Sequence, residues 1–157
     1  MWRGYDGAGD VAEQTGGYVS FFDLTLPLSL PRADYVLSLE VGEHVPSKHE
    51  ASVIRNLHAH NNCGILLSWA HLWQSGHHHV NNHGMDYLER VFTGLGYRRD
   101  DGLTNALRAA SRRREAKAGK PARAPEGVPG RASGPIFDYF GTNAIAFNRI
   151  RPLSVSC

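Results

Sequence analysis

The chain has 157 residues, of which 41% are hydrophobic and 20% are charged, and its net charge is +2. This composition is typical of a globular protein and predicts a single domain over residues 1–157. It excludes a disulfide framework, because Cys63 and Cys157 are the only cysteines, and Cys63 is expected to be a reduced core residue. No apolar run is long enough to span a membrane and no signal peptide begins the chain, so a cytoplasmic location is expected.

The first third of the chain consists of short apolar runs separated by glycine and proline turns. A strand is expected to end at Tyr5, a single helical turn follows at residues 10–14, and a second strand covers residues 18–22. The apolar run over residues 35–39 is typical of a strand that is buried on both faces. Acidic residues follow these strands, at the carboxyl ends where α/β sheets bind ligands.

A polar segment comes directly after the third of these strands. Glu40, Glu43 and His44 lie there within five positions. Ser47 and Glu50 have the spacing of a capping box, which predicts the start of a helix. A buried strand, a polar tip and a capped helix form the first part of a βαβ unit, so this segment is either a ligand site or a charged, solvated loop.

The rest of the chain alternates between helices and strands. A helix is expected over residues 47–60, ended by Asn61 and Asn62, and a strand follows over 64–69. A polar loop over 70–83 leads to an amphipathic helix that carries Leu88, Val91, Phe92 and Leu95. The last expected elements are a short strand over 97–99, a helix over 103–118 and an edge strand over 143–150. The strand–helix–strand spacing predicts parallel pairing of the strands at 35–39 and 64–69 with a right-handed connection.

A basic segment over residues 112–134 interrupts this pattern. Residues 108–131 contain eight of the 17 Lys and Arg residues but only two acids, Glu115 and Glu126, so the remainder of the chain is mildly acidic. The segment is rich in glycine and proline and is expected to be disordered and solvated. It carries no aromatic residues between its basic ones, so nucleic-acid binding is not predicted.

The segment Leu37-Ser-Leu-Glu-Val-Gly-Glu-His-Val-Pro46 resembles the end of the fourth strand in class I S-adenosylmethionine-dependent methyltransferases. Tyr5-Asp6-Gly7 and Phe22-Asp23-Leu24 resemble the ends of that family's second and third strands, Ile65–Ala70 resembles the fifth strand, and Asn143–Ile150 resembles the seventh. The resemblance covers roughly residues 1–100 and 136–150. It implies an α/β fold with a Rossmann-like methyltransferase sheet, mostly parallel, with a C-terminal antiparallel strand.

The family's glycine-rich turn after the first strand has no counterpart in this sequence, because nothing precedes Met1. The resemblance therefore implies a fold that is incomplete at its N-terminus and lacks the first strand and first helix. Such a sheet would be without its centre, and the neighbouring strands would lose their ladder partners. Another chain could complete it.

The resemblance also implies S-adenosylmethionine as the cofactor. The cofactor-binding residues that it implies are Asp6 and Gly7 at the ribose, Asp23 and Leu24 at the adenine, and Glu40 and Val41 near the methionine end. His44 is a candidate catalytic base for an acceptor hydroxyl or amine, and Glu43 is either a second catalytic residue or an electrostatic support for the following helix. From the residues alone, Asp6 and Asp23 could instead be turn-forming aspartates.

The loop Ser68-Trp-Ala-His-Leu-Trp-Gln-Ser-Gly-His-His-His-Val-Asn-Asn82 resembles a Ser-Trp-Ala … Gly-Gln … His-Val-Asn pattern in one branch of methyltransferase-like proteins. The resemblance implies an acceptor pocket that is lined by Trp69, Gln74, His79 and Asn81. A rival interpretation is a metal site made by His71, His77, His78, His79 and His83. Adjacent histidines do not share one face and no Cys or carboxylate completes that set, so no metal site is predicted. A plain surface loop is the third interpretation.

These observations lead to three functional hypotheses. The first is a partial S-adenosylmethionine-dependent methyltransferase that acts on an unidentified small-molecule or protein acceptor. The second is a non-catalytic methyltransferase-like remnant or interaction module, which the missing glycine-rich turn favours. The third, and least favoured, is a His-rich metal-binding domain. No membrane partner is expected in any of the three.

Overall fold

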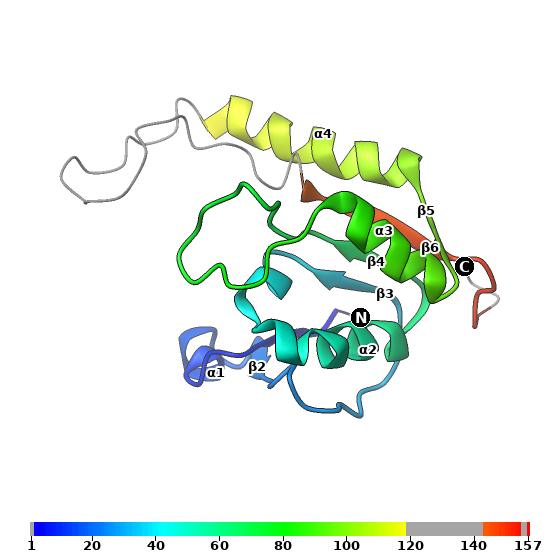
Figure 1. Cartoon of the computed structure of the whole chain (residues 1–157). Helices are drawn as coiled ribbons and strands as arrows, with labels where there is room; N and C mark the ends of the chain where they lie inside the picture. Colours follow the sequence, from blue (N-terminus) through cyan, green and yellow to red (C-terminus); the bar gives the residue numbers. More distant parts are fainter. Residues whose placement is uncertain (1, 119–142, 155–156) are drawn as a thin grey trace.

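The computed structural model describes residues 2–118, 143–154 and 157, and they form two β-sheets with helices packed around them (Figure 1). A two-stranded parallel sheet contains β1 (Gly4–Asp6) and β2 (Val19–Phe21). A four-stranded sheet has the order β3-β4-β6-β5, with β3 (Ala33–Ser38), β4 (Asn61–Leu67), β5 (Tyr97–Arg99) and β6 (Ile145–Arg149). The predicted parallel pairing of β3 with β4 is confirmed.

The predicted antiparallel direction of the last strand is also confirmed, because β6 runs antiparallel to both β4 and β5. Its predicted position is wrong, since β6 lies between those two strands and β5 forms the edge. The helical elements are α1 (Val11–Gln14), the 3-10 turns η1 (Gly42–His44) and η2 (Ser47–His49), α2 (Glu50–Ala59), α3 (Met85–Gly94) and α4 (Asp101–Ala118).

One hydrophobic core joins α2 and α3 to the four-stranded sheet. Apolar residues recur at helical spacing on the two helices and alternate along the strands, so each element turns one face inward. The fully or nearly buried members of this core are Val53, Leu57, Ile65, Leu67, Trp69, Leu88, Phe92, Tyr97, Ile145 and Phe147. On another part of the sheet α4 contacts β6, where Arg108 Nε donates to the Ala144 carbonyl at 2.8 Å.

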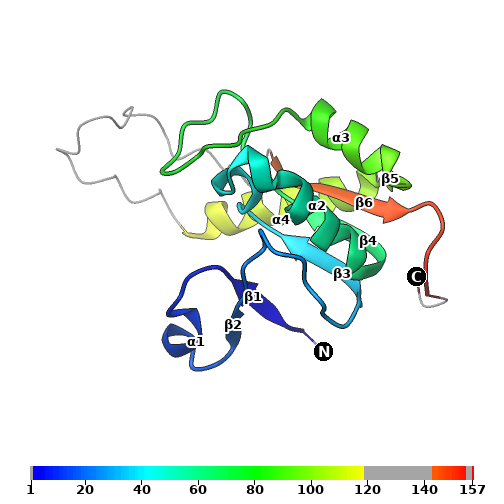
Figure 2. The ribbon, with the colours of Figure 1, turned by 60° about the horizontal axis from the view of Figure 1, so that its bottom comes forward.

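Strand β3 is not buried on both faces, contrary to the sequence prediction. It is the edge strand of its sheet, and no strand in the described part of the chain pairs with its outer edge. Tyr35 and Leu37 are exposed, whereas Val36 and Ser38 point toward the core. Figure 2 shows β1 and β2 beneath this sheet as a separate pair.

The predicted capping box at Ser47 and Glu50 does not form. Helix α2 begins at Glu50 with His49 as its N-cap residue, and no side-chain capping bond is made there. The Glu50 carboxylate instead binds residues more than 30 positions along the chain. Asn61, predicted only to end the helix, begins β4 and donates its side-chain amide to the Leu57 carbonyl at 2.8 Å, which satisfies a helix-end acceptor.

Cys63 is bonded to Cys157 in a disulfide, which corrects the prediction of a reduced core cysteine. The described C-terminal residues turn back beside the start of β4, where Leu153 N donates to the Asn62 carbonyl at 3.0 Å. This return brings two cysteines that are 94 residues apart in sequence to a Cα separation of 5.4 Å. The pairing depends on a chain reversal that local sequence patterns do not reveal.

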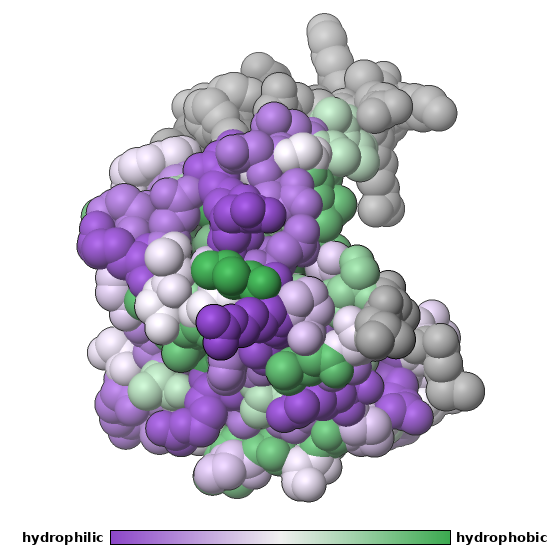
Figure 3. All heavy atoms as spheres, turned by 90° about the vertical axis from the view of Figure 1, so that its right-hand side faces the viewer, coloured by the Kyte–Doolittle hydropathy of each residue, from purple (hydrophilic) through white to green (hydrophobic). Residues whose placement is uncertain are grey.

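The predicted disordered segment at 112–134 is helical at its start, because α4 continues through Ala118. Residues 119–134 lie outside the described residues. None of the helices described has the length and apolar character that a membrane crossing requires. On the side of the molecule drawn in Figure 3, hydrophilic and hydrophobic residues alternate in small groups.

Candidate functional site

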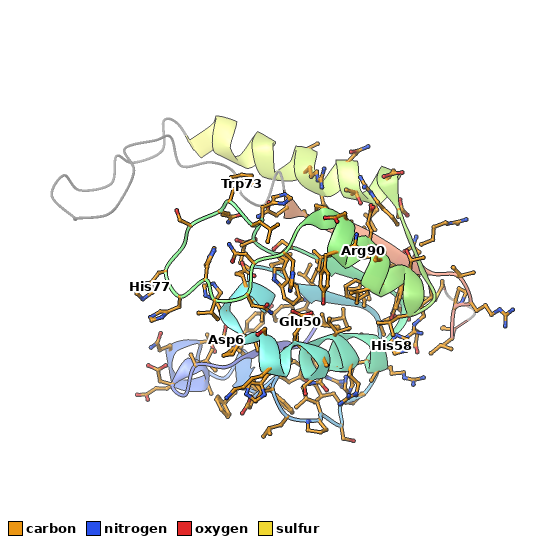
Figure 4. The ribbon with its side chains drawn as sticks, in the orientation of Figure 1. Asp6, Glu50, His58, Trp73, His77 and Arg90 are labelled. Atoms are coloured by element: carbon orange, nitrogen blue, oxygen red, sulfur yellow. A yellow bond between two sulfur atoms is a disulfide. The ribbon has the colours of Figure 1, made fainter. Side chains whose placement is uncertain are left out.

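A pocket of about 500 Å³ lies where the two-stranded sheet faces the segment after β3. Its lining residues are Tyr5, Asp6, Gly7, Phe21, Phe22, Asp23, Leu24, Thr25, Glu40, Val41, His44, Val45 and Pro46. All six residues that the sequence suggested for cofactor binding are in this set, together with the candidate base His44. Three separate segments, within residues 5–7, 21–25 and 40–46, converge on this cavity. Figure 4 labels Asp6, which belongs to the first of them.

Parallel pairing brings Asp6, the last residue of β1, and Asp23, two residues after β2, to the same end of the small sheet. Phe22 N donates to the Asp6 carbonyl at 2.8 Å, so the ends of β1 and β2 stay in register. The Asp23 carboxylate accepts hydrogen bonds from the Thr25 hydroxyl at 2.6 Å and from the Thr25 backbone at 2.8 Å. These bonds hold the pKa of Asp23 below its ordinary value, so this group is ionised near neutral pH.

Glu40 has an unusual backbone conformation, with a φ of 52°. This left-handed region is uncommon for residues other than glycine, and strain of this kind is concentrated at functional sites. Its backbone N–H donates to the Ser68 hydroxyl at 2.8 Å, which ties the turn to the end of β4. Its carboxylate oxygen Oε1 is buried and has no hydrogen-bond partner among the described residues.

Gly42 allows the turn η1 to pack against Trp69. A methyl group at this position would lie 2.3 Å from the Trp69 ring, so only glycine permits the approach. The indole N–H of Trp69 donates to the Asn81 carbonyl at 2.6 Å, which joins the turn to the loop after β4. The sequence analysis did not identify this role of Gly42, because Trp69 lies 27 positions away and no local pattern connects the two.

Glu43 is fully buried beneath the pocket wall. Its carbonyl oxygen accepts hydrogen bonds from Val80 N at 2.8 Å and Asn81 N at 3.0 Å. Neither of its carboxylate oxygens has a hydrogen-bond partner among the described residues. Burial raises the pKa of Glu43 to about 7, and the nearby charge of Glu40 adds to this rise.

The four residues suggested for the acceptor site do not line this pocket. Three of them are buried and hold segments of the chain together: Trp69, Gln74 and Asn81. For example, Asn143 Nδ2 donates a hydrogen bond to Gln74 Oε1 at 2.5 Å, which links the loop after β4 to the residues before β6. His79 is half-buried, and its ring lies 5.0 Å from the ring of His44.

Glu50 forms a polar cluster that the sequence did not predict. Asn81 Nδ2 donates to Glu50 Oε2 at 2.8 Å, His83 Nε2 lies 2.5 Å from the same oxygen, and the Tyr87 hydroxyl donates to Oε1. Figure 4 shows Glu50 at the start of α2, beside α3. Burial alone would raise the pKa of Glu50, but the hydrogen bonds from Tyr87, Asn81 and His83 outweigh it and lower the pKa.

The five loop histidines of the rival metal interpretation do not gather at one point. His71 stacks on Trp73, His83 binds Glu50, and His77 and His78 contact each other at the exposed end of the loop (Figure 4). Within the described residues, only His79 of this set joins a group with metal-ligating geometry, and its companions there are Glu43 and His44.

The fold that holds this pocket is α/β with mixed sheets and matches a Rossmann-like methyltransferase fold. One matching solved structure is magnesium protoporphyrin IX methyltransferase from Synechocystis PCC 6803 with bound SAM, at 15% identity and a TM-score of 0.51, covering 95% of this chain and 58% of that chain. The same protein with bound SAH gives 13% identity and a TM-score of 0.46, with coverage of 90% and 55%. This chain thus spans little more than half the length of the solved protein. No protein-family model matches the sequence. No curated protein matches it either.

Proposed function

We propose that this chain binds S-adenosylmethionine in the pocket and serves as part of a methyltransferase for an unidentified small-molecule or protein acceptor. One observation carries the proposal: Asp6, Asp23 and Glu40 come from three separate segments and line one cavity of about 500 Å³. This volume lies within the range of small-molecule sites. The methyltransferase-like fold supports the proposal, because a solved protein of that fold was obtained with bound SAM.

The residues present fit this cofactor. Two carboxylates at adjacent strand ends can accept hydrogen bonds from the hydroxyl and amino groups of a nucleoside. Oε1 of Glu40 is buried and has no partner in the part of the chain that the structure describes, so it is an acceptor that a bound amino group would satisfy. At Gly7 an added methyl group would meet only the Phe22 carbonyl, at 3.8 Å, so there is open space beside the backbone there.

When bound, S-adenosylmethionine supplies an activated methyl group, and the chain supplies alignment and proton acceptance. Asp6 and Asp23 would orient the nucleoside, with Gly7 and Leu24 beside them. Glu40 and Val41 would face the methionine end. His44 is exposed on the pocket wall, where its imidazole can accept a proton from an acceptor hydroxyl or amine, and Glu43 lies buried behind it.

Calorimetric titration of the full chain with S-adenosylmethionine and S-adenosylhomocysteine tests the proposal. We expect saturable binding that Asp6→Ala and Asp23→Ala each weaken at least about tenfold, which is about 1.4 kcal/mol. Asp34→Ala is the matched control, because Asp34 is exposed and outside the pocket. The absence of binding at millimolar ligand, or equal binding by all variants, would reject the cofactor site.

A non-catalytic interaction module is the second candidate. Among the described strands none pairs with the outer edge of β3, and this edge and the exposed side chains of Tyr35 and Leu37 favour it. An open strand edge is a template for pairing with another chain. Failure of the calorimetric test, together with a sedimentation coefficient that rises with protein concentration, would support this candidate.

A further inference from the structure

Glu43, His44 and His79 form a compact cluster of side chains that can bind a metal. One carboxylate oxygen and two imidazole nitrogens from these residues all lie within 4.8 Å of one another. Within the described part of the chain, no other group of three His, Cys, Asp or Glu side chains brings ligand atoms this close. The set combines oxygen and nitrogen donors, which first-row transition-metal cations accept together.

Glu43 is a second and independent indication of a bound cation. Its side chain is completely buried, and both carboxylate oxygens are without a hydrogen-bond partner among the described residues. A buried carboxylate without a partner is costly, and buried charges in proteins are normally paired or coordinate metals. The neighbouring Glu40 also has a buried carboxylate oxygen without a hydrogen-bond partner among the described residues, so a bound cation would offset the repulsion between the two carboxylates.

The backbone holds the third ligand in place. Val80 N and Asn81 N both donate to the Glu43 carbonyl, so the residues directly after His79 are fixed to the turn that carries Glu43. Gly76 packs on the His79 ring, where a methyl group would lie only 2.2 Å from the imidazole.

The His79 imidazole is also oriented by the backbone. Its Nδ1 lies 3.3 Å from the Gln74 carbonyl oxygen, which can only accept a hydrogen bond. Neutral His79 therefore carries its proton on Nδ1 and keeps its lone pair on Nε2. Hydrogen bonds of this kind orient the imidazole ligands of metal sites.

We propose that Glu43, His44 and His79 bind a divalent transition-metal cation of the Zn²⁺ type, with Glu40 as a neighbouring carboxylate. Three protein ligands leave a fourth tetrahedral position open, as in zinc sites that also bind a water or a substrate. The site differs from the one that the sequence analysis weighed and set aside, because its carboxylate comes from the turn after β3 and not from the histidine loop. His77 and His78 take no part in it.

The metal site goes beyond the proposed function and does not depend on it. Glu43 and His79 lie outside the residues that line the pocket, so cation binding does not need the cofactor. A metal on His44 would occupy an imidazole lone pair, and His44 would then position an acceptor through the metal and would not take its proton. Metal binding and cofactor binding can therefore succeed or fail separately.

The test is a calorimetric titration of the full chain with ZnCl₂ in a non-chelating buffer without S-adenosylmethionine. We expect one saturable site, and we expect Glu43→Gln and His79→Asn each to weaken Zn²⁺ binding at least tenfold. His78→Asn is the matched control, because His78 is an exposed histidine of the same loop, and its affinity should equal that of the wild type. Thermal unfolding of each protein with and without Zn²⁺ gives a second readout, since a metal that binds the native state raises its midpoint.

Each outcome decides the proposal. The proposal is supported if Zn²⁺ raises the thermal unfolding midpoint of the wild type and of His78→Asn, but not that of His79→Asn. If Glu43→Gln does not fold, His44→Asn replaces it, because His44 is exposed and its substitution leaves the core intact. The proposal is overturned if the wild type binds no Zn²⁺, if Glu43→Gln, His44→Asn and His79→Asn all bind Zn²⁺ as tightly as the wild type, or if His78→Asn loses binding while His44→Asn and His79→Asn retain it.

Discussion

The Glu50 cluster yields a stability prediction that can be worked out from its geometry. Replacing Glu50 by Ala removes the acceptor of three side chains, which are those of Asn81, His83 and Tyr87. Hydrogen bonds to a charged group contribute roughly 1.5–3 kcal/mol each. The three bonds share one carboxylate and are not additive, so we expect a loss of about 3 kcal/mol for Glu50→Ala.

The pH dependence of the free energy of unfolding tests this prediction most directly. The pKa of Glu50 lies below its ordinary value of 4.5 in the folded chain, so the folded state favours the ionised carboxylate. Its contribution to stability is therefore full above pH 4.5 and is lost as the pH falls through the lowered pKa. Glu50→Gln keeps the size of the side chain and removes the charge, so its deficit against the wild type should shrink in the same pH window.

Urea denaturation at pH 7, 5, 4 and 3, followed by circular dichroism, measures both effects. Glu13→Gln is the control, because Glu13 is an exposed glutamate on α1 and its replacement should change stability by no more than about 0.5 kcal/mol. This prediction is wrong if Glu50→Gln lowers the free energy of unfolding by the same amount at all pH values, or if Glu50→Ala is as stable as the control.

Three further predictions concern core packing, the disulfide bond and the hydrogen bonds that hold a loop. Gly42→Ala should lower stability by about 1–3 kcal/mol, because its methyl group would overlap the Trp69 ring; an unchanged urea midpoint would contradict this. Cys157→Ser should lose up to about 4.7 kcal/mol, because it opens a loop of 94 residues, and it should behave like the reduced wild type in the same urea titration. Asn56→Ala should lose about 2–3 kcal/mol, because the Asn56 side chain bonds three backbone groups of residues 24–28, and limited proteolysis should then cut that loop faster than in the wild type.

Much of the fold was predictable because local patterns report local structure. The spacing of apolar residues identified α2 and α3, and the strand–helix–strand order identified the parallel pairing of β3 and β4. The acidic residues at strand ends indicated where side chains would converge, because parallel strands end at a common edge. Asp6, Asp23 and Glu40 do line one pocket.

The features that escaped prediction all depend on residues distant in sequence. Burial of β3 was overestimated, because an apolar run does not reveal whether another strand covers its edge. Glu50 satisfied the capping-box rule, yet partners 31 to 37 positions away compete for its carboxylate and prevail. The proposed metal ligands come from a turn and a loop that lie 35 positions apart, so no compact motif marks them.

The double hydrogen bond to the Glu43 carbonyl has a consequence for the motion of the loop after β4. The amide hydrogens of Val80 and Asn81 share this single acceptor, so both lose protection when the loop leaves the turn. Their exchange with deuterated solvent should therefore show equal protection factors and report one local opening event. The exchange of these two backbone amides thus measures how often the loop opens and exposes Glu43 to solvent.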